Sequence, residues 1–358
     1  MQQNYEVRIS DSFEDNEWDN YVSNAPGGHH TQTSRWAEVK ALLGWKAKRI
    51  VFYQDNLIIG GAQILIKALP LLGNAGYITK GPLYHPDDPE LPGLIINQII
   101  KVCQQNNCQL IAIQPHNNDI TLSKRLDSNR FCQSSLELAP TASLVVDLKP
   151  GLEVIMKGMK KKVRQHIRHS ESAGIVVSEG NQADLDIFYR LYLETAQRQR
   201  FTPFKREYFE LLWQTFSPHG WINLLIAWYQ KEAVSAQLLI PFGNTVITKM
   251  IGWSGQYHNF RPNEAIYWAS IRWAFEHGYH YVDFEGVNPH KARELLGGRS
   301  PDMGEDTFKY GFGGQVVLFA PAYDYIPNRV INWVYRIIPP EMEGNSLPAR
   351  FVEYIRKR

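Results

Sequence analysis

The sequence predicts an α+β protein built from two copies of one unit, each with a mixed, largely antiparallel sheet flanked by helices. Internal similarity is the main reason. Three segments recur in the same order: residues 44–54 (GWKAKRIVFYQ) and 220–230 (GWINLLIAWYQ), 62–66 (AQILI) and 236–240 (AQLLI), 78–80 (ITK) and 247–249 (ITK). The offset stays close to half of the 358-residue chain. Such self-similarity indicates an internal repeat.

Composition supports a folded protein with two domains. The chain is 44% hydrophobic and 21% charged, and its length is one at which single cores begin to divide. No apolar run reaches the ~18 residues of a spanning helix, and the start, MQQNYE, lacks a signal-peptide pattern. Three cysteines form neither a disulfide framework nor a zinc motif. We therefore expect a cytoplasmic protein without a metal ion.

In the first unit, predicted to span 1–145, Trp18 and Val22 share helical spacing, as do Trp36, Val39 and Leu43. Hairpin strands, a helix and a last strand should follow, over 44–54, 62–66, 94–104 and 110–113. The predicted boundary lies in the Pro/Gly-containing stretch near residues 140–151.

The second unit, predicted to span 146–325, should begin with one helix over 153–170. Helices over 184–199 and 208–216, a hairpin, a helix over 265–276 and a strand over 281–284 are then expected. The remaining residues, 326–358, should form a C-terminal tail that packs on the body. Their aromatic and basic residues would also suit a membrane surface.

Charge is balanced overall, with a net charge of +2, but one segment is strongly basic. Its cations are Lys157, Lys160, Lys161, Lys162, Arg164 and Arg168. Positive potential of this kind attracts phosphates, lipid headgroups or nucleic acid. The alternative is a solvated helix face with no ligand.

A second notable segment is 306–314 (DTFKYGFGG), where Lys309 interrupts an aromatic run next to three glycines. The glycines permit positive φ and close backbone approach, and a lysine held there could stabilise a developing oxyanion or neutralise a phosphate. The alternative is a glycine-bulged strand with an exposed lysine. Asp283 and Glu285, at the end of a predicted strand, are candidate proton acceptors.

Several motifs together resemble the Fem family (FemA, FemB and FemX), aminoacyltransferases that extend peptidoglycan stem peptides. The resemblance covers nearly the whole chain, through 32–40 (QTSRWAEVK), 81–82 (GP), 141–148 (TASLVVDL), 160–173 (KKKVRQHIRHSESA), 195–198 (TAQR), 208–209 (YF), 262–268 (PNEAIYW), 283–286 (DFEG) and 308–314 (FKYGFGG). It implies two tandem N-acetyltransferase-like (GNAT-like) units. No heptad insertion is present, so we expect the shorter, FemX-like form without a coiled-coil arm.

The resemblance also implies roles for individual residues. Lys309, Phe308 and Asp283 would be catalytic. Substrate would be bound by Lys40, Trp36, Arg35, Lys205, Arg206, Tyr208 and Tyr257, and tRNA by the six cations of the basic segment. Two positions depart from the family pattern: Phe204 replaces a common arginine, and Gln114 replaces the aspartate of an Asp-Pro pair.

The implied reaction transfers an amino acid from aminoacyl-tRNA to an amine of a peptidoglycan precursor stem peptide, in cross-bridge synthesis that supports the cell wall and cell shape. The co-substrate is aminoacyl-tRNA, no cofactor is expected, and the precursor would be nucleotide- or lipid-linked, with contact at the inner face of the membrane. One alternative is an acyl-CoA-dependent N-acyltransferase acting on an envelope sugar or peptide. Residues 261–265 (RPNEA) lack the glycines of a CoA pyrophosphate loop, which disfavours it. A catalytically idle RNA- or envelope-binding module is the other alternative.

Overall fold

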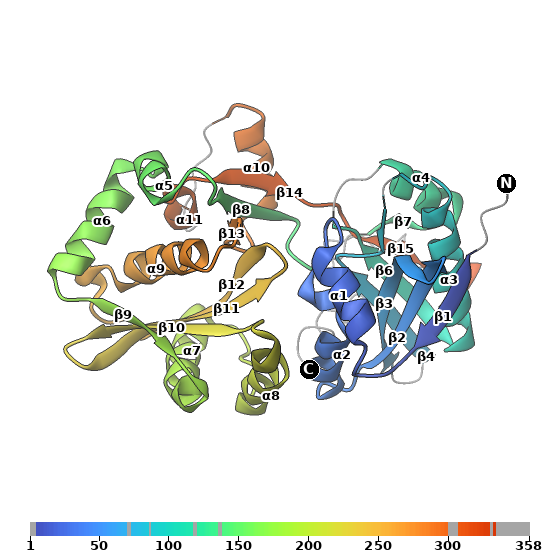
Figure 1. Ribbon diagram of the computed structural model, residues 1–358, viewed down its shortest axis with the longest axis horizontal. Coiled ribbons are helices and arrows are strands. Elements are labelled where there is room, and N and C mark those ends of the chain that lie inside the picture. The colour runs from blue at the N-terminus through green and yellow to red at the C-terminus, as the bar shows by residue number, and fades with distance from the viewer. Residues whose placement is uncertain are drawn as a thin grey trace. The chain divides into compact units, whose positions relative to one another are not determined.

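The computed structural model describes residues 5–69, 73–85, 87–116, 120–134, 138–299, 307–329 and 332–333. The chain divides into two compact units (Figure 1). The first contains the residues up to Thr141 and those from Phe319 onward, and the second is Ala142–Leu318. Both are sheets flanked by helices, so the predicted α+β tandem architecture is confirmed.

The sheet of the first unit has the order β1-β2-β3-β4-β6-β15-β7, with β5 paired to β3. Only the β4–β6 pair on this path is parallel. The strands are β1 (Glu6–Ser10), β2 (Lys46–Gln54), β3 (Leu57–Leu69), β4 (Gly73–Thr79), β5 (Leu83–Tyr84), β6 (Cys108–Gln114), β7 (Cys132–Gln133) and β15 (Tyr323–Tyr325). The helices are α1 (Asn16–Asn24), η1 (His30–Gln32), α2 (Ser34–Ala41), α3 (Leu91–Gln105) and α4 (Ile120–Ser128).

The sheet of the second unit has the order β9-β10-β11-β12-β13-β8-β14, again with one parallel pair, β12–β13. The strands are β8 (Ala142–Asp147), β9 (Val176–Gly180), β10 (Asn223–Tyr229), β11 (Glu232–Phe242), β12 (Thr245–Trp253), β13 (Tyr281–Asp283) and β14 (Gln315–Leu318). The helices are α5 (Leu152–Gly158), α6 (Lys161–Ser172), η2 (Gln182–Asp184), α7 (Leu185–Gln199), α8 (Arg206–Phe216), η3 (Ser217–His219), η4 (His258–Phe260), α9 (Pro262–Glu276), α10 (Pro289–Leu296) and α11 (Thr307–Gly311). Helix α9 covers one face of the sheet, and α7 and α8 lie on the other (Figure 1).

The two sheets have the same topology, with one exchange of strands. Position by position, β1, β2, β3, β4 and β6 correspond to β9, β10, β11, β12 and β13, with the same parallel or antiparallel pairing. The strand beside β6 is β15, from beyond the second unit, whereas the strand beside β13 is β8, which directly follows the first unit. Each sheet is therefore completed by the strand that follows the strands of the other sheet in the sequence.

This exchange corrects the predicted domain limits. The predicted boundary between residues 145 and 146 cuts through β8, which belongs wholly to the second sheet. The predicted second unit, ending at 325, included β15, which pairs with β6 and β7 of the first sheet. Most of the predicted tail, 326–358, lies outside the described residues, so its packing stays a prediction.

Two local predictions also differ from the structure. The helix predicted over 153–170 is two helices, α5 and α6, because Met159 and Lys160 take extended backbone conformations between them. The Lys309 segment is a short helix, α11, and not a glycine-bulged strand. The predicted helices over 94–104, 184–199, 208–216 and 265–276 are confirmed as α3, α7, α8 and α9.

Candidate active site

Lys309 is bound to the backbone at the end of β13. Its Nζ donates to the carbonyl oxygens of Phe284 (2.8 Å), Glu285 (2.8 Å) and Gly286 (2.7 Å). Three carbonyls match the three N–H donors of an ammonium group. Glu285 has φ +30°, an uncommon value for a residue with a side chain, so this contact holds a strained turn in place. Lys309 therefore positions the 284–286 backbone, and its direct contact with an oxyanion stays a prediction.

Beside this turn, Lys249 and Glu285 form an ion pair. Lys249 Nζ lies 2.7 Å from Glu285 Oε1 and 2.9 Å from Oε2, and both side chains are 19% exposed. Lys249 is an extra residue in β12: the β11–β12 register shifts so that Leu238 faces Met250 while Leu239 faces Thr248. Such a β-bulge redirects a side chain and is common next to active sites.

Asp283 lies on the same strand end but is engaged differently. Its Oδ1 accepts hydrogen bonds from Ser143 Oγ and from the backbone N–H of Glu285 (2.8 Å). These bonds join β8 to β13 and fix the start of the 284–286 turn. Asp283, predicted to be catalytic, is thus hydrogen-bonded to the backbone of the turn. The Glu285 carboxylate, in contrast, accepts hydrogen bonds from Lys249.

Aromatic rings form the base of this site. Phe308, also predicted to be catalytic, packs edge-on against Tyr267 and Phe312, with ring centroids 5.1 and 5.3 Å apart. Burial raises the pKa of Tyr267 to about 12, despite hydrogen bonds with Thr248 and Gln237. Tyr267 therefore remains a neutral phenol at physiological pH. The structure brings Lys309, Phe308 and Asp283 together, and their catalytic roles stay predictions.

The basic segment lies against the Lys309 helix. The N–H of Lys160 donates to the carbonyl of Gly311 (2.9 Å), and a Cβ on Gly313 would lie 3.2 Å from the carbonyl oxygen of Gly158. Gly313 has φ +76°, so the predicted glycine-permitted close approach is confirmed. The α5–α6 junction therefore adjoins the backbone that carries Lys309.

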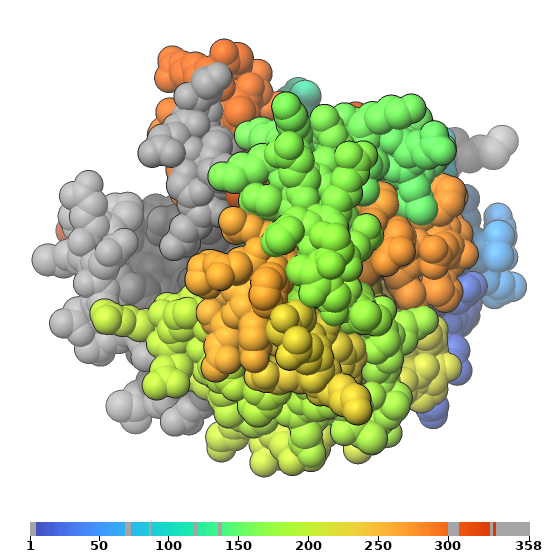
Figure 2. Space-filling model, turned by 90° about the vertical axis from the view of Figure 1, so that its left-hand side faces the viewer, coloured from blue at the N-terminus to red at the C-terminus, as the bar shows by residue number. Residues whose placement is uncertain are grey.

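Most cations of the basic segment face solvent. The exposed members are Lys157, Lys160, Lys161, Lys162 and Arg168. Figure 2 shows the surface over α6, in green, protruding from this side of the second unit. Arg164 is the exception: it is partly buried, and its guanidinium donates to the carbonyls of Lys157 (3.1 Å) and Met159. Arg164 therefore caps α5, and we define the other five as the α5–α6 cationic surface.

The start of α9, where a CoA-binding fold would present free N–H groups to a pyrophosphate, carries an acid. Glu264 is buried, and its Oε1 lies 2.8 Å from His166 Nδ1 on α6. Pro262, the first residue of α9, has no N–H to donate. Glu264 precedes Tyr267 by three residues, so the two side chains share one face of α9. Helix α9 therefore carries both Glu264, which contacts α6, and Tyr267, which belongs to the aromatic cluster beside Lys309.

In the first unit, two buried lysines surround one indole ring. Lys40 Nζ lies 5.6 Å from the Trp36 ring and 6.0 Å from that of Trp45, and Lys67 Nζ lies 5.2 Å from the Trp45 ring. The lysines are only 8% and 6% exposed. Two cations in a low-dielectric setting create a strong positive potential. Arg35 forms ion pairs instead, with Glu14 (2.8 Å) and Glu38 (3.6 Å).

The remaining predicted substrate-binding residues lie in two other places in the second unit. On α8, Tyr208 is buried and stacks on Phe204 with ring centroids 4.4 Å apart. The adjacent Arg206 pairs with Asp186 (2.7 Å) and Glu210 (2.9 Å), while Lys205 is exposed. Tyr257 lies in the second of these places. Its hydroxyl donates to Glu232, the first residue of β11 (2.9 Å).

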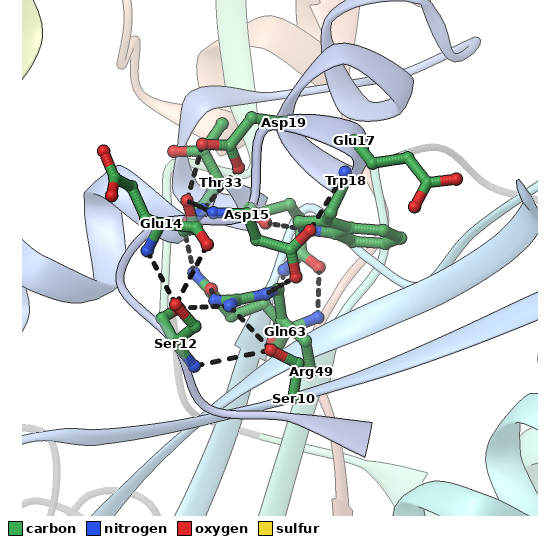
Figure 3. Close-up of polar contacts among 12 residues, drawn as sticks. Ser10, Ser12, Glu14, Asp15, Glu17, Trp18, Asp19, Thr33, Arg49 and Gln63 are labelled. Atoms are coloured by element: carbon green, nitrogen blue, oxygen red, sulfur yellow. Dashed lines mark hydrogen bonds and ion pairs between the residues drawn. The ribbon is translucent and has the colours of Figure 1, made fainter. Parts of the chain in front are cut away.

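Equivalent positions in the two sheets differ in chemistry. Gln63 and Gln237 correspond in the repeat. Gln63 accepts from the fully buried Arg49 (3.1 Å), whose guanidinium also bonds Asp15 and Ser12 (Figure 3). Gln237 instead accepts from Ser270 (2.7 Å), near Tyr267. A buried arginine with several acceptors serves to hold the structure together, so the position equivalent to Gln237 has a structural role in the first unit.

Two residues of these sites were not predicted. Lys249 could have been found from the repeat, because Lys80 and Lys249 end the two ITK segments. Lys67 carries no motif in the sequence. Within the described residues, no helix is long and apolar enough to cross a bilayer. The same residues contain no cluster of three potential metal ligands.

The fold is that of two tandem GNAT-like units. A model described as an acetyltransferase (GNAT) domain matches residues 157–308, and one described as the FemAB family matches 13–131. The structure resembles that of a FemX, with a TM-score of 0.78 and 20% identity over 90% of this chain and 98% of that chain. A tandem GNAT protein from the clavulanic acid biosynthesis pathway gives a TM-score of 0.56 at 9% identity, covering 91% and 99%.

Sequence relatives extend over nearly the whole chain. The lipid II:glycine glycyltransferase of Staphylococcus saprophyticus is 20% identical over 90% of this chain and 94% of its own length. That of Staphylococcus aureus is 20% identical over 91% and 94%. Taken with the FemAB match, these similarities show that the chain resembles Fem-family proteins over nearly its whole length.

Proposed function

We propose that this protein is an aminoacyltransferase that moves an amino acid from aminoacyl-tRNA to an amine of a peptidoglycan precursor. The main support is the contact between the α5–α6 cationic surface and the Lys309 helix, through Lys160 and Gly311. A phosphate backbone bound on that surface would bring its 3′ end to the neighbouring site. The relatives named lipid II:glycine glycyltransferases support the acceptor class and the type of reaction.

The first unit supports an acceptor that carries phosphate. Lys40 and Lys67, buried around Trp45, provide a positive site for a diphosphate of a nucleotide- or lipid-linked precursor. The reaction would take place in the cytoplasm at the inner face of the membrane, where tRNA and such precursors meet. An aminoacyl ester is already activated, so orientation and charge stabilisation suffice without a cofactor or covalent intermediate.

A paired transfer assay tests this proposal. Purified protein receives a pool of labelled aminoacyl-tRNAs or labelled acetyl-CoA, each with nucleotide-linked and lipid-linked muropeptides. We expect label to reach the acceptor from tRNA only, and ribonuclease treatment of the donor to abolish it. Transfer from acetyl-CoA alone would overturn the proposal in favour of an N-acyltransferase. Binding of tRNA without transfer would favour a binding module.

A further inference from the structure

The geometry points to Lys249 and Glu285 as a proton relay for the transfer reaction, with Lys309 as the residue that positions it; this inference rests on the proposed function. Glu285 would be the proton acceptor for the attacking amine, and Lys249 the proton donor to the leaving hydroxyl. The sequence offers Glu285 as one of two candidate proton acceptors, and the structure adds Lys249 as its partner.

Three observations carry this assignment. The β12 bulge directs Lys249 toward the end of β13, where its ammonium contacts both oxygens of Glu285. Lys309 and Asp283 fix the backbone on which Glu285 stands, through its carbonyl and its N–H. Both members of the pair retain access to solvent, at 19% exposure, so a substrate can reach them.

An ion pair with only a structural role would not need the bulge, the Lys309 anchor or the Asp283 hydrogen bond. Partly exposed ion pairs contribute little to stability, in the range of about 0–1 kcal/mol. Here three features hold the Glu285 carboxylate next to the Lys249 ammonium. They are the positive φ of Glu285, the bulge in β12 and the contacts of Lys309 with three carbonyls. Strain maintained by several interactions is typical of catalytic sites.

The relay balances as follows. The neutral amine attacks the ester carbonyl, forming the C–N bond and an oxyanion, and its surplus proton passes to the Glu285 carboxylate. When the oxyanion collapses, the bond from the carbonyl carbon to the ribose oxygen breaks. Lys249 donates a proton to that oxygen and recovers one from the Glu285 carboxyl group. The products are an amide and a free ribose hydroxyl, and the ion pair is restored.

The test compares Glu285→Gln, Lys249→Met and the charge-swapped double variant (K249E/E285K) with the wild type, using Glu276→Gln on the exposed end of α9 as control. We expect each single variant to lower kcat at least ~100-fold, the range of general acid–base catalysis, with tRNA affinity unchanged. The swapped variant should unfold close to the wild-type melting temperature, because the pair contributes little to stability, but it should not regain kcat. The charged groups facing Glu285 are Lys249, Lys309 and Asp283.

Several results would overturn the relay. If the kcat of Glu285→Gln stays within about threefold of that of an active wild type, Glu285 is not the proton acceptor. The proposed function would be unaffected by that result. Recovery of kcat in the swapped variant would show that the pair is only structural. A wild type that transfers no amino acid from any tRNA would overturn both the relay and the proposed function.

Discussion

The backbone N–H of Lys160 lies 2.9 Å from the carbonyl oxygen of Gly311, so the first residue before α6 is hydrogen-bonded to the last residue of the Lys309 helix. This bond joins the most basic segment of the chain to its candidate catalytic lysine. It explains why the helix predicted over 153–170 breaks at Met159 and Lys160, because the Lys160 N–H is committed outside the helix. Cationic surface and reaction site are therefore one structural unit.

Replacing Lys309 should affect both folding and turnover. Lys309→Met removes three charge-assisted hydrogen bonds from partly buried carbonyls, and we expect a loss of about 2–4 kcal/mol in unfolding free energy. Turnover should fall at least ~100-fold, because the Glu285 turn is no longer held. Denaturant unfolding and transfer assays measure the two effects. Wild-type stability in this variant would contradict the anchoring role.

The α5–α6 cationic surface should govern affinity for tRNA. Lys161→Glu and Lys162→Glu should raise the KM for aminoacyl-tRNA and lower the salt dependence of binding, since each removes a phosphate contact. Charge reversal at Lys231, on the β10–β11 turn, is the matched control. Arg164→Glu should instead destabilise the protein, because Arg164 caps α5. A salt-independent wild-type KM would rule out phosphate binding here.

The buried lysines of the first unit should govern affinity for the acceptor. We expect Lys40→Met and Lys67→Met to raise the KM for a nucleotide-linked muropeptide about tenfold or more, since each charge-assisted phosphate bond contributes roughly 1.5–3 kcal/mol. The KM for tRNA should be unchanged. Lys48→Met serves as the control, because Lys48 lies in the same unit and pairs with Asp11 (2.6 Å). An equal rise in the KM for tRNA and for the muropeptide would argue against a role of these lysines in binding the acceptor alone.

His116 should make stability depend on pH. Burial, with the nearby charge of Lys80, lowers the pKa of His116 to about 4. The unfolded chain binds this proton below about pH 6.5, whereas the folded protein binds it only near pH 4. Unfolding free energy should therefore decrease as pH falls from 6.5 to 4, by up to about 3 kcal/mol from this residue. His116→Asn should flatten that part of the profile, measured by urea unfolding; an unchanged slope would refute it.

The strand exchange makes the two units unequal as fragments. Residues 142–318 contain every strand of the second sheet, and we expect this fragment to unfold cooperatively. Residues 1–141 lack β15, which pairs with both β6 and β7. Without β15, the backbone hydrogen-bonding groups on one edge of β6 and one edge of β7 would be unpaired. That fragment should aggregate unless residues 319–329 are fused to it. Thermal unfolding followed by circular dichroism tests both; a stable 1–141 fragment would show β15 to be dispensable.

Much of the candidate site could be predicted because its residues lie close together in the sequence. The DFEG and FKYGFGG segments are short motifs, and the glycines at 313 and 314 signal the positive φ values that the structure shows. The basic segment is equally local. Lys67 was missed because no motif marks it. Lys249 lies in a repeated ITK segment, but its contact with Glu285 exists only in the folded sheet.

The sequence by itself determined the repeat, the order of helices and strands, and the residues around Lys309, since local periodicity and short-range motifs control these features. Only the tertiary structure decided which strand completes which sheet, which cations of the basic segment face solvent, and which carboxylate meets an ammonium. Strand pairing between β6 and β15, or between β8 and β13, depends on contacts more than 130 residues apart. Their energies come from hydrogen bonds and packing that exist only when distant segments meet.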